Sequence, residues 1–241
     1  MVTTMSTSGN ELLRISALHA FYGESHILHG IDFTVYQGEL VTLLGRNGAG
    51  RTTTLKSIVG LVGKRTGSIM VNGRETVNMP THHIAHLGIG YCPEERGIFA
   101  SLSCEENLLL PPEVKSGGMS IKEIYEMFPN LQERRHSPGM RLSGGEQQML
   151  AMARILRTGA QILLLDEITE GLAPVIVQSI GRVIHQLKER GYTIVLVEQN
   201  FRFAAPLADR HYILEHGKIV MTVDKGELQA KTEAMQQYLG V

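Results

Sequence analysis

The sequence has few cysteines, almost no net charge and no long hydrophobic run. Its two cysteines, Cys92 and Cys104, have neither the spacing of metal ligands nor the density of a disulfide scaffold, which indicates buried thiols in a reducing compartment. The formal net charge of -1 over 241 residues disfavours non-specific binding of nucleic acid, although a local basic patch is compatible with it. No apolar run approaches the ~20 residues that a membrane-spanning helix needs.

The length allows one large domain, or a main domain with a small lobe, and disfavours two domains of equal size. Residues 1–10 are small and polar without an apolar core, so we expect them to be disordered and not a secretory signal. Residues 103–137 are polar and helical in composition, with a break at Pro111, which indicates an inserted helical lobe with joints.

Hydrophobic periodicity predicts alternating strands and helices. Alternation of apolar and polar residues predicts antiparallel strands at residues 12–21 and 31–36. Continuous apolar runs predict buried strands, as in a parallel sheet, at residues 40–44, 162–165 and 193–197. Shorter strands are expected at residues 67–73, 89–92, 211–214 and 218–223, and helices at residues 55–62, 80–86 and 174–190, after Asp224 and after Thr232.

A glycine-rich turn after the first buried strand carries the strongest chemical signal. It consists of Gly45, Arg46, Asn47, Gly48, Ala49, Gly50, Arg51, Thr52 and Thr53. Glycines permit backbone angles at which successive N–H groups point at one anion, and the dipole of the following helix favours negative charge there. The pattern matches a phosphate-binding P-loop except at Arg51, where such loops usually have lysine. An ordinary glycine turn is the competing interpretation.

A second helix end able to bind an anion is predicted at Ser143. Residues 142–148 read Leu-Ser-Gly-Gly-Glu-Gln-Gln and precede an amphipathic helical pattern. Ser143 can cap this helix, and Glu146 three residues later completes a capping box. The free N–H groups, beginning with Gly144 and Gly145, and the positive end of the helix dipole then face whatever lies beyond.

Two carboxylates, Asp166 and Glu167, follow the apolar run at residues 162–165. Both can reach one cleft at a strand end, where the chain turns. Asp166 suits a hydrated Mg²⁺ ion and Glu167 an attacking water molecule. An acidic turn beside a buried strand is the competing interpretation, but its occurrence with a glycine loop in an α/β chain argues against chance.

Other candidates carry weaker signals. Tyr22 stands near a glycine, where its ring could lie against adenine, although a core or surface tyrosine is the commoner role. Gln199 follows a buried strand, at the end where α/β folds place ligand-contacting groups. His82, His83 and His86 share a short predicted helix, but no carboxylate or cysteine nearby completes a metal site, so a solvated helix is expected.

These motifs stand in a fixed order and together resemble the ATP-binding cassette of ABC transporters over nearly the whole chain. The segment at residues 142–148 looks like the signature motif of that family. Residues 92–94, 169–174 and 197–200 look most like the second ATPase subunit of branched-chain amino-acid importers. The resemblance implies a P-loop NTPase-type α/β core with a mainly parallel sheet, an antiparallel β subdomain and an inserted α-helical subdomain. Residues 11–241 would form this domain, with the helical subdomain at about 103–158.

The resemblance also implies how one subunit holds Mg-ATP. Tyr22 would stack on adenine, and the N–H groups of residues 47–53 would hold the phosphates. Arg51 would reach the β- and γ-phosphates. Thr52 and Asp166 would serve Mg²⁺.

Further implied roles concern hydrolysis and a second subunit. Glu167 would polarise the attacking water, and Glu94 would sense the γ-phosphate and contact the metal, although the wider family has glutamine there. Gln199 takes the place of the switch histidine of many relatives. Residues 143–145 would serve the nucleotide that the opposite subunit of a head-to-tail dimer mainly holds.

The function implied is that of a peripheral ATPase at the cytoplasmic face of the inner (plasma) membrane, which energises integral-membrane permease subunits. It would pair with itself or with a sister ATPase subunit, and no nucleic-acid partner is expected. A non-transport cassette in DNA repair or translation is one alternative, but such proteins commonly have a long coiled-coil insertion or two cassettes. A regulator with little turnover is another, because Arg51 replaces a compact ammonium with a longer planar fork.

Overall fold

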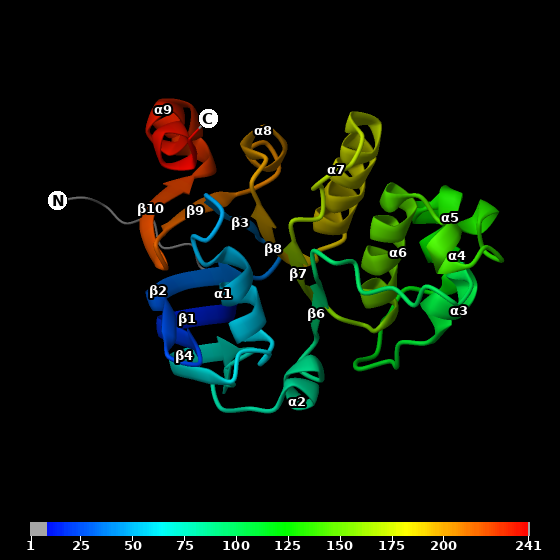
Figure 1. Cartoon of the computed structure of the whole chain (residues 1–241), viewed down its shortest axis with the longest axis horizontal. Helices are drawn as coiled ribbons and strands as arrows, with labels where there is room; N and C mark the ends of the chain where they lie inside the picture. Colours follow the sequence, from blue (N-terminus) through cyan, green and yellow to red (C-terminus); the bar gives the residue numbers. More distant parts are fainter. Residues whose placement is uncertain (1–8, 241) are drawn as a thin grey trace.

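The computed structural model of the chain describes residues 9–240 and arranges them around two β-sheets (Figure 1). The disorder predicted for residues 1–10 falls mostly on residues outside this range, and Gly9 and Asn10 lead directly into the first strand. Of the helices that the structure describes, none is long and apolar enough to cross a membrane.

The first sheet is antiparallel and has the strand order β2-β1-β4-β5. Its strands are β1 (Glu11–Tyr22), β2 (Ser25–Tyr36), β4 (Lys64–Val71) and β5 (Arg74–Glu75). The predicted antiparallel pair is confirmed, but β2 already begins at Ser25, because Gly30 continues the strand at φ 86° where a break was expected. The strand predicted at residues 67–73 ends at Val71, and Asn72 and Gly73, both at positive φ, form the turn between β4 and β5.

The second sheet is mainly parallel and has the order β10-β9-β3-β8-β7-β6. Its strands are β3 (Leu40–Gly45), β6 (Ile89–Cys92), β7 (Ile162–Asp166), β8 (Thr193–Glu198), β9 (Arg210–Glu215) and β10 (Lys218–Asp224). Only the β9–β10 pair among them is antiparallel. This confirms the α/β fold class. Because parallel strands end at one edge, Gly45, Asp166 and Glu198 lie at the same edge of the sheet.

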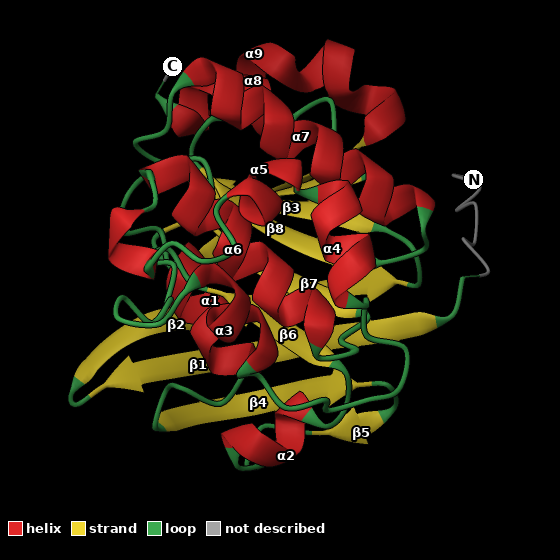
Figure 2. Cartoon of the chain, turned by 90° about the vertical axis from the view of Figure 1, so that its right-hand side faces the viewer, coloured by secondary structure: helices red, strands yellow, loops and turns green. Residues whose placement is uncertain are grey.

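Helices cover the sheets on several sides (Figure 2). They are α1 (Arg51–Ile58), α2 (Thr81–Ala85), α3 (Cys104–Leu109), α4 (Ile121–Met127), α5 (Pro129–Glu133), α6 (Gly144–Arg157), α7 (Pro174–Glu189), α8 (Phe201–Ala204) and α9 (Leu228–Leu239), with short 3-10 turns at Gly139–Arg141 and Lys225–Glu227. The helix start expected after Thr232 is wrong, because Thr232 lies inside α9 and its hydroxyl donates to Leu228 O at 2.7 Å. Helix α8 was not predicted, and α1 ends before the predicted residue 62.

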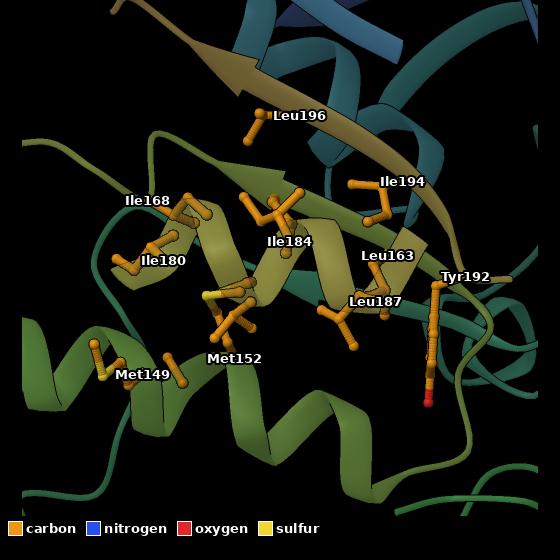
Figure 3. Packing of buried hydrophobic residues seen from close by; sticks show 14 of the residues in the cluster. Met149, Met152, Leu163, Ile168, Ile180, Ile184, Leu187, Tyr192, Ile194 and Leu196 are labelled. Atoms are coloured by element: carbon orange, nitrogen blue, oxygen red, sulfur yellow. The ribbon is translucent and has the colours of Figure 1, made fainter. Parts of the chain in front are cut away.

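The core lies on both faces of the parallel sheet, which explains the continuous apolar runs. On β7, Leu163 and Leu165 join the hydrophobic cluster under α6 and α7, whereas Ile162 and Leu164 join the cluster under α1 and the antiparallel sheet. Burying such a side chain contributes roughly 1.5–3 kcal/mol. Figure 3 shows the first cluster, where side chains of α6, α7, β7 and β8 converge.

Helices α3, α4 and α5 pack against α6 at one side of the molecule (Figure 1, green). The buried face of α6 in turn packs against the sheet and α7, so this group of helices is joined to the core through one long helix. The assignment of residues 103–158 to a subdomain of their own stays a prediction.

Candidate functional site

A cavity of about 430 Å³ opens over the carboxyl edge of the parallel sheet. Its lining comprises Tyr22, Ile27, Asn47, Gly48, Ala49, Gly50, Arg51, Thr52, Thr53, Glu94, Glu167 and Glu170. The fold therefore brings the glycine turn, the predicted adenine contact and two of the predicted acidic residues, Glu94 and Glu167, to one place. Tyr22 stands at the end of β1 with 47% of its surface exposed, so its ring is available to a flat ligand.

The glycine turn requires glycine for steric reasons. Gly48 and Gly50 have φ of 79° and 104°, and a Cβ on Gly50 would lie 2.7 Å from the Leu28 side chain. Gly50 precedes α1 without a side-chain cap, so the N–H groups of its first turn are open to an anion. Before the helix, the Ala49 N–H is not open in this way, because it donates to Arg46 O at 3.0 Å. The backbone of this turn fits a phosphate.

The Arg51 side chain is turned inward, away from the mouth of the cavity. It is 4% exposed; Nη1 donates to Gly45 O at 2.6 Å and to Glu198 O at 2.9 Å. Its Nη2 donates to Asn47 Oδ1 at 3.2 Å and forms an ion pair with Glu167 Oε1 at 2.6 Å. The guanidinium is thus bound by protein acceptors, and the phosphate contact implied for Arg51 stays a prediction.

Asp166 is fully buried at the end of β7 and accepts two side-chain hydrogen bonds. Thr52 Oγ1 donates to Oδ1 at 3.0 Å, and the Tyr91 hydroxyl donates to Oδ2 at 2.9 Å. Burial raises the pKa of Asp166, and the bonds from Tyr91 and Thr52 oppose that rise. The Thr52–Asp166 pair offers the hard oxygen ligands that Mg²⁺ prefers. Tyr91 was not predicted, and its only signal in the sequence is its position on the strand that ends just before Glu94.

Three carboxylates gather at the same cavity. One oxygen from each of Glu94, Glu167 and Glu170 lies within 4.8 Å of the others. Burial raises the pKa of Glu167 to about 7, against the effect of Arg51 and with added repulsion from Glu170 and Glu94. Burial also raises the pKa of Glu94, and Glu170 and Asp166 raise it further. A divalent cation would offset this repulsion, so the donor set fits Mg²⁺. Glu170 was not predicted, although it stands in the turn after Glu167.

Gln199 lies beside the first cavity and not in it. It lines a neighbouring cavity of about 270 Å³ that also contacts Glu167 and Glu170. Gln199, just after β8, therefore shares a cavity with two of these carboxylates.

The predicted cap of α6 is present. The Ser143 hydroxyl accepts from Glu146 N at 3.3 Å, and Glu146 Oε2 accepts from Ser143 N at 2.7 Å. Ser143, Gly144 and Gly145 are absent from the lining of the two cavities, as far as the described residues show. Within one chain, the two helix starts that can bind an anion do not share a cavity.

The remaining candidates behave as ordinary structural residues. Cys92 and Cys104 are buried and unpaired with each other, as predicted. His82, His83 and His86 are exposed on and after α2, which fits the expected solvated helix.

Comparison with known proteins agrees with this geometry. The family model for ABC transporters matches residues 28–170, more than half of the chain. The high-affinity branched-chain amino acid transport ATP-binding protein BraG of Pseudomonas aeruginosa is 40% identical over 95% of this chain and 100% of its own. A probable branched-chain amino acid transport ATP-binding protein, LivF of Archaeoglobus fulgidus, is 37% identical over 90% of this chain and 94% of its own. The lipopolysaccharide export system ATP-binding protein LptB of Haemophilus influenzae is 33% identical, with 95% and 97% covered.

Solved structures share the fold. An ATP-binding subunit of an ABC transporter superposes with a TM-score of 0.80 at 25% identity, covering 95% of this chain and 100% of its own. A dimeric ATP-binding cassette in a post-hydrolysis state with ADP and Pi superposes with a TM-score of 0.79 at 24% identity, with 89% and 99% covered. The chain belongs to the ABC transporter family and is one of its ATP-hydrolysing subunits.

Proposed function

We propose that the protein is the ATPase subunit of an importer for branched-chain amino acids. The observation that carries this is the 40% identity to BraG, which spans nearly all of both chains, together with a cavity that has the residues for Mg-ATP. Lipopolysaccharide export is the second candidate, because LptB is 33% identical over a similar span.

The residues predicted for the site take the following roles in this proposal. Tyr22 covers the adenine ring, and the N–H groups of residues 47–53, apart from the bonded Ala49 N–H, hold the phosphates. Mg²⁺ held by Thr52, Asp166 and Glu94 would neutralise phosphate charge. Glu167 accepts a proton from the attacking water, a task suited to a carboxylate whose pKa is about 7. Gln199 donates an amide hydrogen bond to the γ-phosphate or to that water.

A second subunit completes the site. At the start of α6, the N–H groups of Gly144 and Gly145 and the positive dipole end do not reach the cavity of their own chain, whereas the Ser143 N–H is used in the capping box. We infer that a second copy or a sister ATPase subunit binds head to tail and places this helix end on the nucleotide. Closure of the pair on ATP, and its opening after hydrolysis, would drive transport.

The permease partner and the location follow from the same proposal. Large apolar side chains of Phe99, Leu109, Leu110 and Met140 are exposed on and near the helices α3 to α6, where a membrane subunit could dock. The protein would then lie at the cytoplasmic face of the inner membrane without crossing it, and no nucleic acid would take part.

Transport assays separate the two candidates. Deleting the gene should abolish uptake of labelled leucine, isoleucine and valine while lipopolysaccharide still reaches the cell surface. Loss of lipopolysaccharide export with normal uptake would instead support the second candidate. ATP hydrolysis by the purified protein, alone and with its copurifying permease, tests whether turnover depends on the membrane partner.

A further inference from the structure

Both terminal nitrogens of the Arg51 guanidinium donate to acceptors of the protein. Two main-chain oxygens, those of Gly45 and Glu198, accept from Nη1, and Asn47 and Glu167 accept from Nη2. Among these four acceptors, only the Glu167 oxygen belongs to a carboxylate. A lysine has no planar fork with which to reach acceptors in this fixed geometry, so the arrangement depends on arginine.

The partner of Arg51 is the carboxylate assigned to the attacking water. The two side chains are 4% and 12% exposed, so the ion pair is mostly shielded from solvent. Breaking such a pair without a replacement leaves a poorly solvated charge on each side. Phosphate is a replacement that the guanidinium can bind bidentately. The backbone that would hold phosphate lies in the same turn.

We propose that Arg51 is a positioning residue for Glu167: it holds the carboxylate at the P-loop until the phosphates of ATP take over the guanidinium and release Glu167 to the attacking water. This inference rests on the proposed function, since it requires ATP in this cavity. Release leaves Glu167 beside Glu94 and Glu170, which favours a cation at the same moment.

Glu170 provides a matched control for testing the exchange. It lines the same cavity and lies in the same carboxylate cluster, but it forms no ion pair with Arg51 among the described residues. Glu167→Gln and Glu170→Gln each remove one carboxylate from the same cavity, but only the first removes the charged partner of Arg51.

The first experiment is a calorimetric titration of wild type and both variants with a non-hydrolysable ATP analogue, ADP and AMP, in EDTA. Glu167→Gln should tighten binding of the ATP analogue about tenfold, because a shielded ion pair no longer has to be broken. Glu170→Gln should tighten it only about twofold through the general loss of negative charge. Neither variant should change AMP binding, because AMP has no β- or γ-phosphate to take Arg51.

The second experiment needs no nucleotide. A double-mutant cycle of Arg51→Met and Glu167→Gln, followed by urea unfolding, should show coupling of at least about tenfold in the unfolding constant. The matched cycle of Arg14→Met and Glu11→Gln, an exposed pair on β1, should show almost none. If Arg51→Met does not fold, the titrations decide alone.

The outcomes distinguish the two proposals. Nucleotide binding with equal tightening by Glu167→Gln and Glu170→Gln would overturn the role of Arg51 and leave the proposed function standing. Absence of coupling in the Arg51 cycle would also overturn that role. A wild-type protein that binds no nucleotide under any condition would overturn the proposed function and this inference with it.

Discussion

Helices α1 and α6 both start at glycine-containing segments, but they differ in how their N-termini are capped. Helix α1 follows Gly50 in a left-handed conformation and has no side-chain cap. Helix α6 follows Ser143 and is closed by a complete capping box with Glu146. The start of α1 faces a cavity with carboxylates from its own chain, whereas the start of α6 faces neither cavity. One half of the proposed site is therefore built within the chain, and the other needs a partner.

The largest effect is expected at the α1 side, from Glu167→Gln. Loss of the group that accepts the water proton should lower the rate of phosphate release at least ~100-fold, while ATP binding persists. Release of inorganic phosphate and nucleotide affinity should be measured on the same preparation. Glu126→Gln, an exposed change on α4, is the control for the loss of a carboxylate. Full hydrolysis by Glu167→Gln would remove Glu167 from the catalytic role.

The second prediction concerns Glu198, which is buried at the carboxyl end of β8. Burial raises the pKa of Glu198 to about 7, although Thr169 donates to its carboxylate. The folded state therefore binds a proton that the unfolded chain, with its pKa of about 4.5, releases. Stability should fall as pH rises from about 4.5 to 7, by about 3 kcal/mol from this group.

Urea unfolding at pH 5 and pH 8 measures that dependence. The Glu198→Gln protein should lose much less stability between these values than wild type does, whatever its absolute stability. The Glu146 carboxylate of the α6 cap acts with the opposite sign and only below this pH range, because hydrogen bonds from Ser143 outweigh burial and hold its pKa below the usual range. Equal pH dependence in wild type and Glu198→Gln would contradict the assignment.

The third prediction addresses the α6 side and has a matched control within the chain. Ser120 caps α4 with the same capping box that Ser143 forms at α6. Ser143→Ala and Ser120→Ala should each cost about 1 kcal/mol of unfolding free energy. Only Ser143→Ala should also lower the rate of ATP hydrolysis, because only that helix end is proposed to meet a nucleotide. Equal hydrolysis by both variants would count against the second half of the site.

Local chemistry made much of this molecule predictable. Continuous apolar runs located β3, β7 and β8, and the alternation near the N-terminus located β1. The capping box of Ser143 and Glu146 was readable from a spacing of three residues. These features depend on neighbours in sequence, so the sequence is sufficient to predict them.

The remaining features depend on which strands become neighbours. The bond from Tyr91 to Asp166 exists because β6 pairs with β7, an order that the sequence does not reveal. The inward turn of Arg51 likewise needs acceptors from three segments, at Gly45, Glu167 and Glu198. A charge in a P-loop pattern predicts a phosphate contact, but only the fold shows which protein groups compete for it.

The smallest effect is expected at Tyr22, on the outer rim of the α1 side. Its ring is half exposed at the end of β1 and lines the cavity, so it contributes stacking and no charge. Tyr22→Ala should weaken ADP binding by about 1 kcal/mol, roughly fivefold, whereas Tyr22→Phe should retain nearly full affinity because the ring remains. Fluorescence titration with a labelled adenine nucleotide measures both. Equal affinity of all three proteins would show that the adenine ring does not stack on Tyr22. The proposed phosphate contacts would be unaffected, because other variants test them.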